Sequence, residues 1–186
     1  MAKPQQMDPF YTWSPRALRQ GLLISFIATL GCFLAIAATN RPLENDIAPL
    51  GILSLQFAGK LPAALMILNS WDETARLYAA FNLGFDHLYL ACYSLFLSLT
   101  CSWLARAWQH EAQGFATAGF LLAWAMFAAA ALDMVENVAL WQLLLGSMNA
   151  HWPKLATTCA MLKFGILLAG VGYVVIGLLA MLRRAH

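Results

Sequence analysis

The fold is decided by residues 119–145, GFLLAWAMFAAAALDMVENVALWQLLL, an apolar run that contains one aspartate, one glutamate and one asparagine. About 20 apolar residues cross the roughly 30 Å hydrocarbon core of a bilayer, so this run is long enough to span a membrane. Charged side chains within hydrocarbon are costly and usually face a partner, a cavity or a ligand. The stretch therefore predicts a transmembrane helix and makes its polar residues, Asp133, Glu136 and Asn137, candidates for a functional site.

Composition places the whole chain in the same class. Of the 186 residues, 61% are hydrophobic and only 11% are charged, whereas an ordinary soluble domain has about 25% charged residues. We therefore expect a single membrane domain over residues 1–186, with much of its surface facing lipid. The net charge is only +2 and the basic residues are scattered along the chain. The sequence therefore shows no basic patch of the kind that binds nucleic acids. The four cysteines form no C-x-x-C pair and are expected to be small core residues.

Four apolar runs are long enough to span a bilayer, and they predict an all-α, polytopic membrane protein built as a four-transmembrane-helix bundle. Ser14 and Pro15 suit the N-cap and the first position of the first helix. We expect this helix to be retained rather than cleaved as a signal, because its apolar run exceeds the usual length of about 7–15 residues. The predicted spans are 15–38, 84–105, 116–145 and 155–182.

Residues 40–83, between the first two spans, predict a helical extracytoplasmic cap. Apolar residues recur at helical spacing over residues 61–71, while residues 47–58 are apolar without a clear period. Ser70 and Glu73 form the S-x-x-E pattern of a capping box, which predicts a new helix that continues or kinks into the second span. A structureless loop of this length is uncommon in a compact fold.

Basic residues near the ends of the spans predict that both termini are cytoplasmic. With the N-terminus inside, six lysines and arginines flank the cytoplasmic ends and four flank the opposite ends, a bias that agrees with the positive-inside rule. The six are Lys3, Arg16, Arg19, Arg106, Arg183 and Arg184, and the four are Arg41, Lys60, Arg76 and Lys154.

Polar residues of three predicted spans are expected to meet at one depth. Asp133, Glu136 and Asn137 follow an i, i+3, i+4 spacing, so they project from one face of the third helix. Counting back about 20 residues from the cytoplasmic ends of the second and fourth spans puts Asp86 and Lys163 near the outer boundary. The predicted binding pocket, beneath the cap, consists of Asp86, His87, Tyr93, Asp133, Glu136, Asn137 and Lys163.

The charges of this pocket do not balance. Its three carboxylates and one lysine leave two negative charges uncompensated if every group is ionised. A proton on one carboxyl group or a bound cation would compensate them. Zinc prefers nitrogen and sulfur ligands, and no ligand-spacing motif for magnesium or calcium is present. We therefore predict no metal site and leave the cofactor undetermined.

A set of motifs between residues 51 and 173 carries a resemblance to known sequences. The motifs are GILSLQFAG at 51–59, Trp71, FDHL at 85–88 with Tyr93, DMVEN at 133–137, and CAMLKF at 159–164 with Tyr173. Together they resemble a family of small, uncharacterised bacterial four-helix integral membrane proteins, of which the D-x-x-E-N element in the third helix is the most specific part. His87 and Gln56 depart from the family pattern, which has an apolar or aromatic residue and a glutamate there. The resemblance implies the four-helix architecture and the bacterial inner (cytoplasmic) membrane, and it implies no activity.

Three functions remain open. We favour a buried outer-leaflet pocket that binds a small cation or a polar lipid headgroup, because charges pair strongly in a low-dielectric site. An intramembrane enzyme could instead use Asp133 or Glu136 as a general acid or base on a lipid-like substrate, although the usual catalytic motifs are missing. A structural or assembly subunit could use the polar cluster to fix helix register. Transport would require a homo-oligomer, since four helices are few for one monomer. The expected partners are membrane lipids and a small cation or amphiphile.

Overall fold

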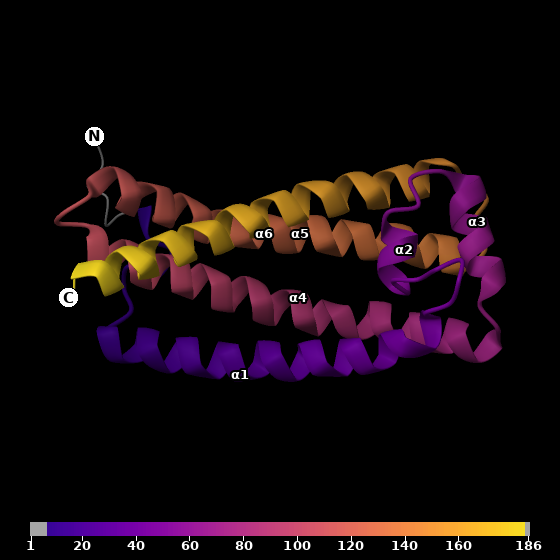
Figure 1. Cartoon of the computed structure of the whole chain (residues 1–186), viewed down its shortest axis with the longest axis horizontal. Coiled ribbons are helices and arrows are strands. Elements are labelled where there is room, and N and C mark those ends of the chain that lie inside the picture. The colour runs from indigo at the N-terminus through magenta and orange to yellow at the C-terminus, as the bar shows by residue number, and fades with distance from the viewer. Residues whose placement is uncertain (1–6, 185–186) are drawn as a thin grey trace. The chain divides into compact units, whose positions relative to one another are not determined.

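The computed structural model describes residues 7–184, and these residues form helices and connecting turns without any strand. Four helices are long and apolar enough to cross a membrane, which confirms the predicted helical class and the four candidate spans. The long helices are α1 (Pro15–Asn40), α4 (Glu73–Trp108), α5 (Gln113–Leu144) and α6 (His151–Arg184). Shorter elements lie between α1 and α4 in the chain: η2 (Arg41–Leu43), α2 (Ile52–Gln56) and α3 (Leu61–Ser70) (Figure 1).

Local sequence signals explain where two of the long helices begin. The Ser14 hydroxyl accepts a hydrogen bond from the backbone N–H of Ala17 at 3.2 Å, so Ser14 caps α1 as predicted. The start of α4 differs from the prediction, because Asp72 and not Ser70 accepts the capping bond, from the N–H of Ala75 at 2.7 Å. Ser70 is the last residue of α3. From Glu73, α4 continues without a break into the second predicted span.

The described residues form two compact units. Unit 1 comprises residues 7–29, 92–130 and 164–184, and unit 2 comprises residues 30–91 and 131–163. Each long helix contributes one part to each unit. The helices differ in how much of their apolar surface the protein covers: 11% of the most apolar stretch is buried in α1, compared with 50% in α4. The prediction of a single membrane domain stays a prediction.

Unit 1 is packed through small residues and aromatic rings. The ring of Tyr173 in α6 stacks on Phe115 of α5, with ring centroids 4.3 Å apart. Gly119 of α5 faces the hydroxyl of Tyr173 so closely that no side chain larger than hydrogen fits there. The hydroxyl of Ser98 in α4 donates to the backbone oxygen of Ala123 in α5 at 2.7 Å. Close approach through small residues is the usual way in which membrane helices associate.

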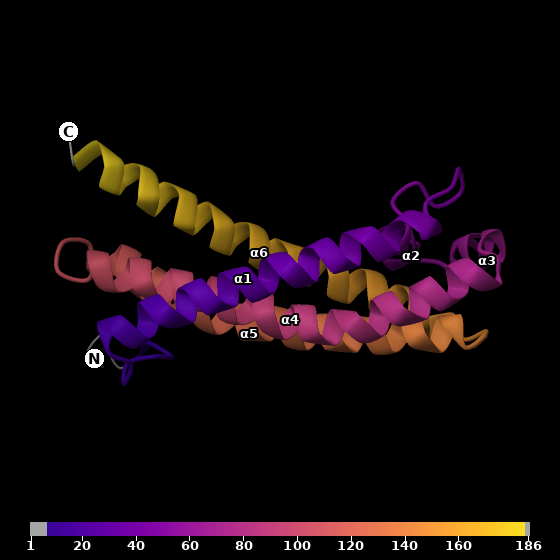
Figure 2. The ribbon, with the colours of Figure 1, turned by 90° about the horizontal axis from the view of Figure 1, so that it is seen from below.

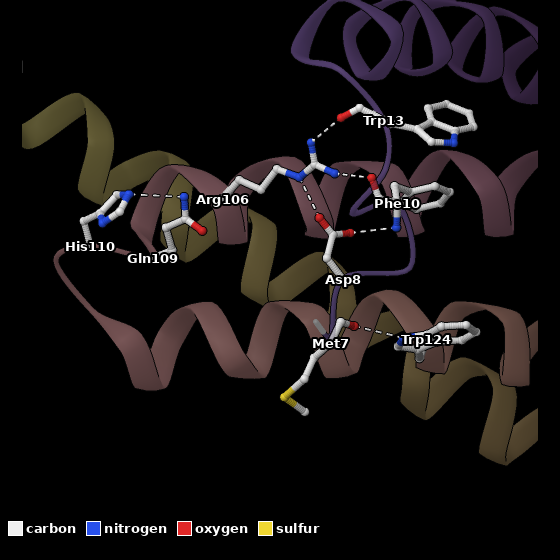
Figure 3. A network of polar contacts seen from close by, with 8 residues as sticks. All are labelled: Met7, Asp8, Phe10, Trp13, Arg106, Gln109, His110 and Trp124. Carbon is white, nitrogen blue, oxygen red and sulfur yellow. Dashed lines mark hydrogen bonds and ion pairs between the residues drawn. The ribbon is translucent and has the colours of Figure 1, made fainter. Parts of the chain in front are cut away.

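Within unit 1, the segment before α1 is held against α4 by Arg106 (Figure 3). Its Nε donates to Asp8 Oδ2 at 2.6 Å, and its other nitrogens donate to the backbone oxygens of Phe10 and, at 3.1 Å, of Trp13. Asp8 also accepts the backbone N–H of Phe10 at 2.9 Å. The Asp8 side chain is buried, whereas that of Arg106 is 21% exposed. From the sequence, Arg106 was interpreted only as a basic residue that flanks the cytoplasmic end of a predicted span.

We expect Arg106→Gln to loosen residues 7–14, because Asp8 would keep a buried carboxylate without its cation. A buried acceptor that loses its donor costs about 1–2 kcal/mol where water can replace part of the interaction. The unfolding midpoint should fall by a few degrees, and amide hydrogen exchange should accelerate within residues 7–14. Arg19→Gln removes an exposed arginine of α1 and serves as the control. Unchanged exchange in residues 7–14 would show that Arg106 does not hold the segment.

Unit 2 contains the segment that the sequence predicts to be a cap. In Figures 1 and 2, α2 and α3 lie beside the part of α4 that begins at Glu73. Nε1 of the buried Trp71 donates to the backbone oxygen of Leu43 at 2.9 Å. The hydroxyl of Thr157 in α6 donates to the backbone oxygen of Gln56 at 2.7 Å. The segment is therefore folded and partly helical, as expected, and its position outside a membrane stays a prediction.

The short helix α2 was not predicted, because residues 47–58 show no helical period. Gly51 precedes it with a φ of 57°, in the left-handed region that favours glycine. The Asn40 side-chain oxygen accepts the backbone N–H of Ile52 at 2.9 Å. A residue 12 positions away therefore caps this helix, which a search for local sequence signals does not detect.

Candidate functional site

The candidate site is a buried polar cluster in unit 2 to which α4, α5 and α6 all contribute. The α5 part consists of Asp133, Glu136 and Asn137, which lie within about one turn and leave the helix on one face. All three are buried, and Glu136 and Asn137 are completely buried. Polar side chains are rare within membrane helices and are almost always turned toward other protein groups.

Lys163 of α6 reaches two carboxylates of α5. Its Nζ lies 2.5 Å from Asp133 Oδ1 and 2.8 Å from Glu136 Oε2, and the residue is 4% exposed. The contact with Asp133 is a hydrogen bond. The contact with Glu136 is an ion pair. One ammonium group therefore joins α6 to two acidic side chains that are one helical turn apart.

Asn137 joins α5 to α4. Its side-chain nitrogen donates to Asp86 Oδ2 at 2.6 Å. Because the nitrogen of the amide points to Asp86, the amide oxygen Oδ1 points away from that carboxylate. Asp86 is half-buried and is therefore the most accessible charged member of the cluster.

Two completely buried side chains of the cluster have oxygens without a hydrogen-bond donor among residues 7–184. These oxygens are Oε1 of Glu136 and Oδ1 of Asn137, whereas Oε2 of Glu136 lies 2.8 Å from Nζ of Lys163. A buried acceptor without a donor costs about 1–3 kcal/mol, and more when it is charged. Native proteins leave few such groups, and each requires a physical explanation. The cluster can therefore accept hydrogen bonds from a donor outside its own side chains.

Five of the seven predicted pocket residues are joined by the ion pairs and the amide bond described above. Nδ1 of His87 lies 3.0 Å from the backbone oxygen of Leu83, one turn earlier in α4, which is a bond within its own helix. Tyr93 is buried and belongs to unit 1. The residues joined by the ion pairs and the amide bond are Asp86, Asp133, Glu136, Asn137 and Lys163.

Two buried amide residues of unit 2 were not among the predicted pocket residues. The side-chain nitrogen of Asn82 in α4 donates to the hydroxyl of Thr39 in α1 at 3.0 Å and to the backbone oxygen of Ile36 at 3.2 Å. Its position four residues before Asp86, on the same face of α4, was a signal that could have indicated it. Gln56 is buried and its side-chain oxygen has no donor among the described residues.

Comparisons with known proteins assign no family and no function to this chain. Comparison of the chain with family models, with curated proteins and with solved structures finds no match. Membership of the family of bacterial four-helix membrane proteins therefore stays a prediction. Within residues 7–184, no group of three histidine, cysteine, aspartate or glutamate side chains is arranged to hold a metal ion.

Proposed function

We propose that this chain is an integral membrane protein whose buried polar cluster binds a small cation or a polar lipid headgroup. The observation that supports this proposal is that two buried oxygens, Oε1 of Glu136 and Oδ1 of Asn137, lack hydrogen-bond donors among the described residues, while Lys163 is already paired with Asp133 and with Oε2 of Glu136. If every group is ionised, three carboxylates face one lysine in the cluster, which favours a positive ligand. Attraction between opposite charges is strong where the surroundings have a low dielectric constant.

In this proposal the long helices cross the bacterial inner membrane with both termini cytoplasmic, and α2 and α3 belong to an extracytoplasmic cap. Lys3, which enters the charge count behind this orientation, lies outside the described residues. At about 1.5 Å per residue, Glu136 lies about 12 Å along α5 from Leu144, and Lys163 about 18 Å along α6 from His151. Half of a hydrocarbon core about 30 Å thick is about 15 Å, so Glu136 lies in the outer half if Leu144 marks the boundary, and Lys163 does so if the core begins about one turn beyond His151.

A purely structural role is the second candidate, because the same contacts join three helices. Lys163 links α6 to α5, and the bond between Asn137 and Asp86 links α5 to α4. Buried polar groups can fix helix register in this way without any ligand. The two candidates differ in one measurable respect, since only a binding site changes the stability of the protein when a ligand is added.

The test is thermal unfolding of the purified protein in detergent micelles. The probes are potassium chloride, methylammonium chloride and a phospholipid with an ethanolamine headgroup. A ligand at 100 times its Kd stabilises a protein by about 2.7 kcal/mol, which corresponds to a rise of roughly 5–11 °C in Tm for a chain of this size. We expect at least one probe to raise the Tm of the parent protein in this way.

Two variants make the test specific. Glu136→Gln removes the buried charge and should abolish the rise in Tm. Glu111→Gln makes the same chemical change at an exposed position and should preserve the rise. If no probe raises the Tm of the parent protein more than that of Glu136→Gln, the binding proposal is wrong and the structural role remains.

A further inference from the structure

We infer that the group bound at this cluster is a primary ammonium, which offers at least two N–H donors together with its positive charge. This inference rests on the proposed function and narrows its ligand from any cation or polar headgroup to one chemical class. The same ammonium occurs on a lipid headgroup and on a small free amine.

The unpaired atoms identified at the cluster are hydrogen-bond acceptors. An ionised carboxylate accepts only, and so does the oxygen of a side-chain amide. Oε1 of Glu136 and Oδ1 of Asn137 therefore require a partner that donates. Lys163 already shows which donor suits this environment, because its ammonium is held by Asp133 and Glu136.

The acceptors are oriented toward different neighbours. Glu136 contacts Lys163 of α6, whereas the amide of Asn137 is turned by its bond to Asp86 of α4. Since these are consecutive residues of α5, their side chains leave the helix about 100° apart. One group that satisfies both must therefore present two hydrogens in different directions. A primary ammonium carries three tetrahedral N–H bonds and meets this requirement.

Other ligand classes satisfy only part of the cluster. A quaternary ammonium carries the charge but has no N–H, so the acceptors of Glu136 and Asn137 would stay unpaired. A neutral hydroxyl supplies a donor and leaves the carboxylates uncompensated. Magnesium and calcium take six or more oxygen ligands, more than the unpaired oxygens of these two side chains provide. The half-buried Asp86 offers a further negative charge at the accessible side of the cluster.

The test compares pairs of ligands with the same charge in which the three N–H hydrogens of one are replaced by methyl groups in the other. The free pair is methylammonium and tetramethylammonium chloride, and the lipid pair is an ethanolamine and a choline phospholipid with identical acyl chains. Affinity for the parent protein is measured from the concentration dependence of Tm, with lipid binding checked by native mass spectrometry. Each hydrogen bond to a charged or buried acceptor contributes about a factor of ten or more. We therefore expect the primary amine of a pair to bind at least about 100-fold more tightly than its quaternary partner.

The outcomes separate the inference from the proposed function. A preference for the primary amine in both pairs supports the inference. It also shows that the cluster recognises the ammonium group itself, whether on a lipid or on a free amine. A preference in the lipid pair only identifies a headgroup, and a preference in the free pair only identifies a small amine. Equal binding of primary and quaternary ligands that Glu136→Gln abolishes overturns the inference and leaves the proposed function standing. If no ligand binds, both are wrong. The comparison within each pair uses the parent protein, so it does not depend on the folding of any variant.

Discussion

Lys163→Met is expected to lower the free energy of unfolding by about 3–5 kcal/mol, the cost of removing one partner from a buried ion pair. The substitution keeps the length and apolar stem of the side chain but leaves Asp133 and Glu136 buried without the ammonium that contacts both. For a chain of this size the loss corresponds to a fall of roughly 6–20 °C in Tm. Thermal and denaturant unfolding in the same detergent would measure it.

Two further variants test whether the charge is responsible. Lys154→Met changes an exposed lysine of the same helix and is expected to alter stability by no more than about 0.5 kcal/mol. Adding Asp133→Asn and Glu136→Gln to Lys163→Met removes the unpaired charges as well and should recover most of the loss. If Lys163→Met is as stable as Lys154→Met, the ion pairs do not hold α5 and α6 together.

Gly119→Ala is expected to destabilise unit 1 by about 3 kcal/mol, at the upper end of the cost of overpacking. An added Cβ would lie 2.1 Å from the hydroxyl oxygen of Tyr173 and 2.8 Å from Cβ of Ala105. The ring of Tyr173 is held by stacking on Phe115 and Cβ of Ala105 is fixed to the backbone of α4, so we expect the helices themselves to separate. The fall in the unfolding midpoint of the purified variant measures the effect.

The matched control for this prediction is Gly114→Ala in the same helix, where an added Cβ meets no atom within 4 Å. It should be neutral or slightly stabilising, because alanine favours helix over glycine by about 1 kcal/mol. Combining Gly119→Ala with Tyr173→Phe removes the nearest obstructing atom and should restore part of the stability. Equal stability of the two glycine variants would contradict the packing that we describe.

The sequence predicted the residues of the cluster better than their contacts. Helical spacing alone places Asp133, Glu136 and Asn137 on one face, since the period of an α-helix is fixed. Which partner each residue meets depends on the rotation and depth of the neighbouring helices, which side-chain packing decides. The pairing of Asn137 with Asp86, and of both acidic residues of α5 with Lys163, therefore required the structure.

Elements held by distant residues were the least predictable. Arg106 and Asp8 are 98 positions apart, so no local pattern connects them. The cap of α2 comes from Asn40 for the same reason. At the start of α4 two local signals competed, and Asp72 rather than Ser70 became the cap because Ser70 completes the preceding helix.

The bond from Asn82 to Thr39 has a consequence for α1, the helix with the smallest share of its apolar stretch covered by protein. In a bilayer, lipid tails contact such a helix about as favourably as apolar side chains do, so hydrophobicity alone does not retain it. Its attachment to α4 then depends on polar contacts such as this bond and on close packing, as between the rings of Phe26 and Phe96, whose centroids lie 5.4 Å apart. We therefore expect the tilt of α1 in a membrane to follow the thickness of the surrounding hydrocarbon more closely than that of the better-covered α4.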